Sequence, residues 1–107
     1  MSKYQNVKTE FDGLKFDSKK EAARYAVLRL LERGNVISEL KLQVPFELAP
    51  SVVINGRKKP ALRYIADFVY RKDGQWVTED CKGALTDLYK AKRHLMKSVH
   101  NIEILET

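Results

Sequence analysis

Apolar residues recur every three or four positions between residues 16 and 34, which is the spacing of one buried helical face. The positions that follow this spacing are Ala23, Ala26, Val27, Leu30 and Leu31. Asp17 and Ser18 are candidate N-caps, and Gly34 stands where such a helix would end. Glu21 follows Ser18 by three residues, as in a capping box. The pattern predicts a first helix whose apolar stripe packs against the core.

The middle of the chain alternates between apolar and polar residues, as a half-buried strand does. In the segment 36–50 the alternating apolar positions are Leu42, Val44, Phe46 and Leu48. Pro45 lies inside this run and donates no backbone hydrogen bond, so we expect an edge strand or a bend there. Two turn signals, Asn55-Gly56 and Lys72-Asp73-Gly74, separate the next apolar runs and predict two hairpins.

A second helical pattern occupies residues 86–100, after Gly83. Its apolar positions are Leu88, Ala91, Leu95 and Val99, and its other faces carry Lys90, Lys92, Arg93 and Lys97. Residues 101–107 have the pattern of a short final strand. The order helix, three or four strands, helix, strand predicts an α/β domain of the α+β kind. We expect a mixed sheet of about four to five strands flanked by the helices.

Length and composition are those of one small globular domain. A chain of 107 residues suits one core and is too short for two, so we expect a single domain over residues 1–107. No apolar run approaches the ~18 residues of a membrane span, and residues 1–12 lack a secretory pattern. Cys81 is the single cysteine, which excludes an internal disulfide. We therefore expect a cytoplasmic protein with no membrane partner.

The chain carries an excess of positive charge, with 20 Lys and Arg against 14 Asp and Glu and a net charge of +6. Such an excess on a small domain attracts polyanions, above all nucleic acid. Residues 1–12 form an expected basic N-terminal arm. DNA is therefore the expected partner, although basic charge alone also suits proteins that bind no nucleic acid.

Three charged residues interrupt the strand pattern between residues 64 and 83: Asp67, Asp80 and Lys82. Residues two apart share a strand face, so Asp80 and Lys82 are expected on one face and Cys81 on the other. A hairpin that turns near residue 73 pairs positions whose numbers add to about 147, which sets Asp67 opposite Asp80. Opposed carboxylates repel unless Lys82 or a metal ion neutralises them. An exposed cross-strand salt-bridge cluster is the simpler alternative.

Asp67 followed by Asp80-Cys81-Lys82 resembles the motif of the PD-(D/E)XK nucleases, which have the restriction-endonuclease-like fold. In that superfamily the first acid lies on the second core strand, and the acid-X-Lys motif lies on the third. A Glu often lies on the first helix, where this chain has Glu21. Here Ala66 takes the place of the motif's Pro. The chain as a whole, with "KFDSKKEAARY", "LQVPFEL", "YIADFVY" and "DCKG", resembles a small family of phage and prophage proteins assigned to this superfamily.

The resemblance implies a metal-dependent DNA endonuclease that hydrolyses phosphodiester bonds with Mg²⁺, for which Mn²⁺ is expected to substitute. The implied metal ligands are Asp67, Asp80 and Glu21, and Lys82 would assist the attacking water. Glu21 could equally be only a capping residue. Gln43 is a possible support of the site or an ordinary solvent-facing strand residue. The expected DNA contacts are Lys20, Arg24, Lys90, Arg93 and Lys97.

Other functions remain open from the sequence. The chain could be a non-catalytic nucleic-acid-binding or regulatory phage protein on the same fold, or a subunit that needs a partner for activity. No sequence-reading module is visible, which favours recognition of DNA shape, such as branched or recombining DNA. Cutting two strands with one site per chain implies a homodimer. No organic cofactor is expected.

Overall fold

The computed structural model describes residues 8–82 and 84–107. Its elements are, in chain order, β1 (Thr9–Phe11), β2 (Leu14–Phe16), α1 (Lys19–Arg33), β3 (Ser38–Ala49), β4 (Val52–Ile54), β5 (Arg57–Lys59), β6 (Leu62–Lys72), β7 (Gln75–Asp80), α2 (Asp87–His100) and β8 (Leu105–Glu106). The protein is a mixed α+β domain, as the sequence predicts. In the described part of the chain, no helix has the length and apolar character needed to cross a membrane.

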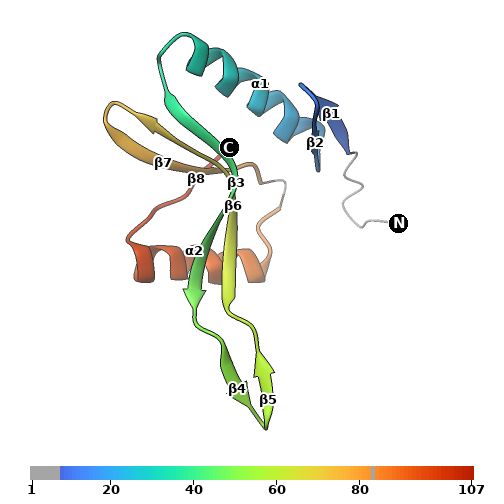
Figure 1. Ribbon diagram of the computed structural model, residues 1–107, viewed down its shortest axis with the longest axis vertical. Coiled ribbons are helices and arrows are strands. Elements are labelled where there is room, and N and C mark those ends of the chain that lie inside the picture. Colours follow the sequence, from blue (N-terminus) through green and yellow to red (C-terminus); the bar gives the residue numbers. More distant parts are fainter. Residues whose placement is uncertain (1–7, 83) are drawn as a thin grey trace.

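The main sheet has the strand order β3-β6-β7-β8 (Figure 1). β3, β6 and β7 are antiparallel neighbours, whereas β8 pairs in parallel with β7. β3 lies at the edge, which confirms the position inferred from Pro45. Leaving out the small hairpins, the core follows the order α1, β3, β6, β7, α2, β8, which is the predicted order.

Both predicted hairpin turns form at their Gly positions. Asn55 and Gly56 have φ of 51° and 74°, and Asp73 and Gly74 have φ of 51° and 77°. Two consecutive left-handed residues form the type of turn that matches the twist of paired strands, and Asn-Gly and Asp-Gly adopt it readily. The first turn joins β4 to β5, and the second joins β6 to β7.

The first helix begins and ends as predicted, but its buried face differs. Ser18 is the N-cap and accepts a hydrogen bond from the Glu21 amide, and Gly34 is the C-cap. The buried positions are Glu21, Ala22, Tyr25 and Leu28. The predicted face is wrong: Ala23 and Val27 are exposed and Leu30 is 65% exposed, while Ala26 and Leu31 are half-buried.

The buried face of the second helix also differs from the predicted one. Tyr89 and Met96 are buried, whereas Leu88 is 63% exposed and Ala91 and Val99 are also exposed; Leu95 is half-buried. A tyrosine can be buried once its hydroxyl has a partner. The Tyr25 hydroxyl donates to Asp12 at 3.3 Å, and that of Tyr89 donates to Glu106 at 2.6 Å. These bonds make the tyrosine-bearing faces the favourable ones to bury.

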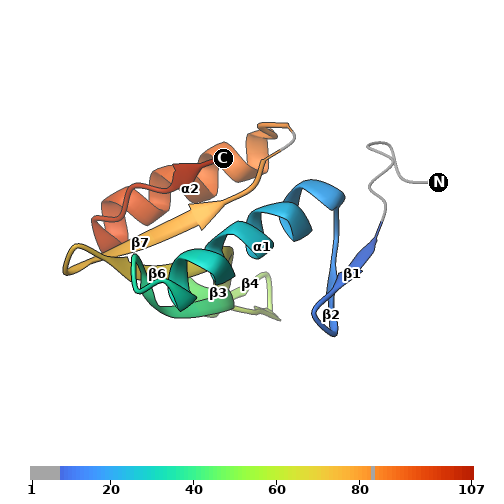
Figure 2. The ribbon, with the colours of Figure 1, turned by 90° about the horizontal axis from the view of Figure 1, so that it is seen from above.

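Two apolar clusters cover the two faces of the sheet. One packs around α1 and includes Phe68 and Tyr70; the other packs around α2 and includes Val69. Successive residues of a strand point to opposite faces, so α1 and α2 cover opposite faces here. Figure 2 shows the two helices on either side of β7.

In the middle of β3 and β6, residues two apart in the chain no longer point to the same face of the sheet. Ala66 belongs to the α2 cluster, whereas Phe68, two residues later, belongs to the α1 cluster. In β3 the same shift separates Leu42, against the α1 cluster, from Val44, against the α2 cluster. The residues between are Asp67 and Gln43. We call this place the pleat switch.

Candidate active site

The β6–β7 hairpin brings Asp67 next to the end of β7. Its paired positions add to 147, as in Phe68↔Glu79, which is the predicted register. Asp67 and Asp80 are the next positions beyond that pair. The Cys81 amide donates to Asp67 Oδ2 at 2.9 Å, which continues the contact between the two strands past the last ladder pair.

Asp80 is buried and held by two polar partners. Its carboxylate is 2% exposed and accepts a hydrogen bond from the Tyr64 hydroxyl at 2.7 Å. Lys82 Nζ lies 3.1 Å from the same oxygen, so Asp80 and Lys82 share a face as the strand period predicts. The Lys82 ammonium also lies 4.3 Å from the centroid of the Tyr89 ring, in cation–π geometry. Tyr64 and Tyr89 therefore shape the site.

The Asp67 carboxyl is half-buried and resists ionisation. Burial, followed by the hydrogen bond to Asp80 and the negative charge of Asp80, raises the pKa of Asp67 to about 8. The Cys81 amide acts in the opposite direction because it donates to the carboxylate. Two carboxyl groups this close favour sharing a proton when no cation lies between them.

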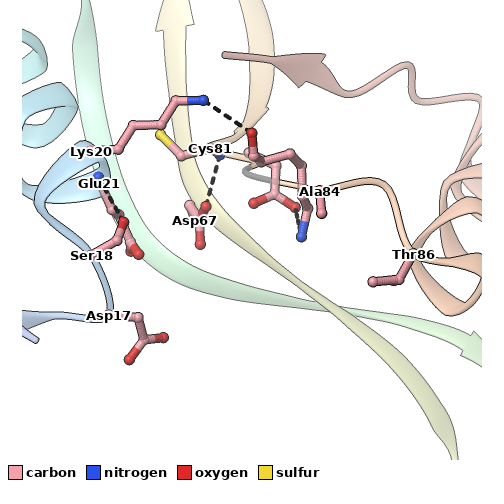
Figure 3. A pocket seen from close by; sticks show the side chains of 10 residues that line it. Asp17, Ser18, Lys20, Glu21, Asp67, Cys81, Ala84 and Thr86 are labelled. Carbon is pink, nitrogen blue, oxygen red and sulfur yellow. Dashed lines mark hydrogen bonds and ion pairs between the residues drawn. The ribbon is translucent and has the colours of Figure 1, made fainter. Parts of the chain in front are cut away.

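These residues line one pocket of about 470 Å³ (Figure 3). The lining residues are Asp17, Ser18, Lys20, Glu21, Asp67, Asp80, Cys81, Lys82, Ala84 and Thr86. The predicted catalytic residues Glu21, Asp67, Asp80 and Lys82 are all among them. They come from three segments: the start of α1, the middle of β6, and the end of β7 with the residues after it.

Glu21 contacts a second predicted residue within this region. The Gln43 side-chain amide donates to Glu21 Oε2 at 3.3 Å. Burial, and then the negative charges of Asp17 and Asp80, raise the pKa of Glu21 above its ordinary value. The Glu21 amide donates to Ser18 Oγ at 3.1 Å, which is one of the two hydrogen bonds of a capping box. The Glu21 carboxylate, however, is turned toward the pocket and Gln43, which keeps its metal-ligand role a prediction.

Gln43 lies in an unusual backbone conformation. Its φ is 53°, in the left-handed region that side chains other than glycine rarely adopt. The pairs Leu42↔Phe68 and Val44↔Ala66 flank it, which places Gln43 opposite Asp67. A left-handed residue inside a strand breaks the alternation of side chains, so Gln43 accounts for the pleat switch in β3. Strained residues of this kind concentrate at functional sites.

The predicted DNA contacts fall into two groups. Lys20 lines the pocket and donates from Nζ to the Lys82 carbonyl at 3.0 Å. On α2, Arg93 pairs with Glu106, Lys97 pairs with Glu103, and Lys90 lines the same groove of about 460 Å³ as both. Because Arg93 and Lys97 already pair with acids, the net charge of this groove is smaller than its lysines and arginine suggest.

Arg24 forms an ion pair with Glu79 that the sequence pattern does not predict. Its guanidinium donates two hydrogen bonds to Glu79, at 2.6 and 2.9 Å. The Tyr70 hydroxyl adds a third bond to Glu79 at 2.7 Å, and the Thr107 hydroxyl adds a fourth at 3.2 Å. The strand period predicts that Glu79 points away from Asp80. It does not predict the partners of Glu79, because Arg24 lies 55 positions away in the sequence. Contact of Arg24 with DNA stays a prediction.

The donor set fits a divalent cation that is partly coordinated by water. Mg²⁺ commonly takes one or two carboxylates and completes its shell with water and phosphate oxygens. The Asp67–Asp80 pair supplies two carboxylates whose mutual repulsion a cation would relieve. Among the described residues, no three His, Cys, Asp or Glu side chains converge closely enough to hold a metal by themselves. Glu21 therefore lines the same pocket as Asp67 and Asp80 but does not complete a three-ligand metal site with them.

Comparison with known proteins places the chain in a family. No curated protein matches it. A family described as a protein of unknown function, DUF1064, matches residues 1–104. Since this match covers nearly the whole chain, the protein belongs to the DUF1064 family.

Proposed function

We propose that the protein is a Mg²⁺-dependent DNA endonuclease. The observation that carries this proposal is the grouping of Asp67, Asp80 and Lys82 in one open pocket, where burial and the neighbouring Asp80 raise the pKa of Asp67. The buried Asp80 beside the half-buried Asp67 lowers the stability of the fold, because two nearby carboxyl groups disfavour each other's ionisation. The pair suits a site that receives a metal and an anionic substrate.

The chain's own residues would act in distinct ways. Asp67 and Asp80 would hold the metal, which supplies a more acidic bound water and charge neutralisation at phosphorus. The Tyr64 hydroxyl and the Cys81 amide fix one oxygen of Asp80 and of Asp67, respectively. The Lys82 ammonium, held between Asp80 and the Tyr89 ring, lies where it can face a developing negative charge. Glu21 would support the metal or a water from the α1 side.

The resemblance to PD-(D/E)XK nucleases supports this proposal. The first acid lies on β6 and the acid-X-Lys motif spans the end of β7, which are the second and third strands of the core order. Glu21 lies in the first turn of α1, where members of that superfamily often have a Glu. These positions agree with the motif even though Ala66 replaces its Pro. A preference for branched or recombining DNA, and a homodimer, are part of the proposal.

Cleavage assays test the proposal directly. The protein is incubated with Mg²⁺ or Mn²⁺ and linear duplex, single-stranded, flap and four-way-junction DNA, and light scattering reports its oligomeric state. We expect metal-dependent cutting that Lys82→Ala abolishes while DNA binding stays within a few-fold. Lys72→Ala is the matched control, because Lys72 is exposed at the other end of the same hairpin. Full cutting by Lys82→Ala would refute the assignment.

A non-catalytic nucleic-acid-binding protein is the second candidate. One observation favours it: Asp80 already has an ion pair with Lys82, so the site is partly neutralised without a metal. Calorimetric titration with Mg²⁺ separates the two functions. A nuclease should bind Mg²⁺ in the wild type and lose this binding in Asp80→Asn. DNA binding without Mg²⁺ binding by either protein would favour the second candidate.

A further inference from the structure

The hairpin formed by β4 and β5 projects away from the rest of the fold (Figure 1). Residues 51–60 are all exposed, so no packing against the helices or the main sheet accounts for their composition. The strands pair as Val52↔Lys59, Val53↔Lys58 and Ile54↔Arg57, around the Asn55-Gly56 turn. We call residues 51–60 the arm.

The composition of the arm is unusual for a solvated hairpin. One strand is entirely apolar and the other entirely cationic, and Val53 is 70% exposed. Within residues 8–82 and 84–107, no ion pair involves Arg57, Lys58 or Lys59. The arm therefore presents three uncompensated cations and three exposed apolar side chains to a partner.

The arm is attached to the strands that carry the candidate site. From Asp67 the chain runs back along β6 to Leu62, and the tip begins at Arg57. At about 3.3 Å per residue, ten residues span at most about 33 Å, close to the 34–36 Å of one turn of duplex DNA. A duplex that is bound at the pocket and runs along β6 would thus meet the arm within about one turn.

Both faces of the arm carry positive charge. Side chains alternate along each strand, so Lys58 points to one face while Arg57 and Lys59 point to the other. A groove of duplex DNA has phosphates on both walls, and the major groove is wide enough for a two-stranded ribbon. Cations on both faces suit that arrangement, with Val53 and Ile54 near the tip available for contact with sugars and base edges.

We propose that the arm is a DNA-binding element that enters a groove of duplex DNA about one turn from the scissile phosphate. This inference rests on the proposed nuclease function for the position of the cut, and it names the contact that holds the duplex. Arg57, Lys58 and Lys59 bind phosphates. A second copy of the chain is a poorer occupant: two β5 edges placed together would bring like charges together, and two β4 edges placed together would leave the three cations without partners.

The test measures binding apart from cleavage. Duplex DNA longer than two helical turns is titrated in EDTA at several salt concentrations, with fluorescence anisotropy as the signal. The variant is Arg57→Gln/Lys58→Gln/Lys59→Gln. A plot of log K against log salt has a negative slope, and each lost phosphate contact should make it less steep by about 0.9. For three lost contacts we expect a slope that is less steep by about 2–3, together with weaker binding. The matched control, Arg33→Gln/Lys41→Gln/Lys72→Gln, removes the same charge from exposed positions on other elements.

Equal slopes for the arm variant and the control would overturn the proposal, as would a wild type that does not bind duplex DNA. A second variant, Val53→Ser/Ile54→Ser, should weaken binding several-fold and leave the slope unchanged. If it instead changes the mass measured by light scattering and leaves DNA binding intact, the arm is a contact between copies and the proposal is wrong. The nuclease proposal fails separately, when the wild type binds duplex through the arm but never cuts it.

Discussion

Glu79 and Asp80 are neighbours at the end of β7, and their surroundings differ on the two faces of the sheet. Both are buried, with exposed fractions of 0% and 2%. Glu79 lies on the α1 side, where Arg24, Tyr70 and Thr107 donate to it. Asp80 lies in the pocket, where it has Tyr64 and Lys82 and lies beside a second acid, Asp67.

The contrast indicates which of the two buried acids is the better candidate for a functional role. The partners of Glu79 use its hydrogen-bonding capacity inside the protein, and its bidentate arginine neutralises it. Asp80 has a lysine but also a competing carboxyl, in contact with a pocket of about 470 Å³. Burial alone does not separate the two acids. The separating feature is the second carboxyl, Asp67, which lines the same pocket as Asp80, and four predictions test it.

The largest difference is expected in cleavage. Asp80→Asn should reduce the proposed metal-dependent cutting by about 10³-fold, equivalent to about 4 kcal/mol of lost transition-state stabilisation, because the proposed metal would lose a ligand. Glu79→Gln should leave the cutting rate of folded protein within a few-fold, since Glu79 faces away from the pocket. Single-turnover assays on protein whose fold is verified by circular dichroism measure both. Similar losses in both variants would remove the distinction between the two acids.

The next effect concerns stability on the Glu79 side. Arg24→Met leaves the Glu79 carboxylate buried without its cation, which should lower the free energy of unfolding by about 3 kcal/mol. The double variant Arg24→Met/Glu79→Met should recover most of this loss because no charge is left unpaired. Urea unfolding measures the change. A double variant that is no more stable than Arg24→Met would contradict this account.

The two tyrosines that bond to these acids provide a matched pair. Tyr64→Phe and Tyr70→Phe each remove one hydroxyl that donates to a buried carboxylate at 2.7 Å. Each should cost about 2 kcal/mol of unfolding free energy. Only Tyr64→Phe should also change the Mg²⁺ affinity measured by calorimetry, because only Tyr64 orients Asp80. Equal Mg²⁺ affinity in both variants would show that Tyr64 does not position the site.

The smallest effect is the pH dependence of stability in EDTA. Because the pKa of Asp67 is raised to about 8, the folded protein keeps a proton that the unfolded chain releases near pH 4. This contribution is fully present below about pH 4 and is lost as the pH rises to about 8. Discounted for partial exposure, it amounts to about 1 kcal/mol.

Asp67→Asn should therefore gain stability relative to the wild type between pH 5 and pH 8, as measured by thermal unfolding. Asp73→Asn, at the exposed turn of the same hairpin, is the control and should follow the wild type. Parallel pH profiles for Asp67→Asn and the wild type would show that Asp67 ionises normally.

The sequence predicts the local features of this fold well. The ends of α1, the two glycine turns and the strand register are confirmed, because caps, turn residues and hairpin length act over a few residues. That register is also what places Asp67 beside Asp80.

The buried helix faces and the Glu79 network depend on partners far along the chain. Tyr89 is buried with help from Glu106, and Glu79 is neutralised by Arg24, 55 positions away. Nor does any periodicity indicate that Gln43 adopts a positive φ. These features follow from tertiary contacts, which outweigh the helical spacing of Val27, Leu30, Leu88 and Val99.

The pleat switch at Gln43 and Asp67 has a consequence for how the molecule opens. It divides β3 into one part that packs against the α1 cluster and one part that packs against the α2 cluster, while β6 contacts only the α2 cluster before Asp67 and both clusters after it. Backbone amides in the two parts can then exchange hydrogen with solvent through separate partial unfolding events. A ligand bound at the junction, where α1, β6 and the end of β7 meet, would slow exchange in both parts at once.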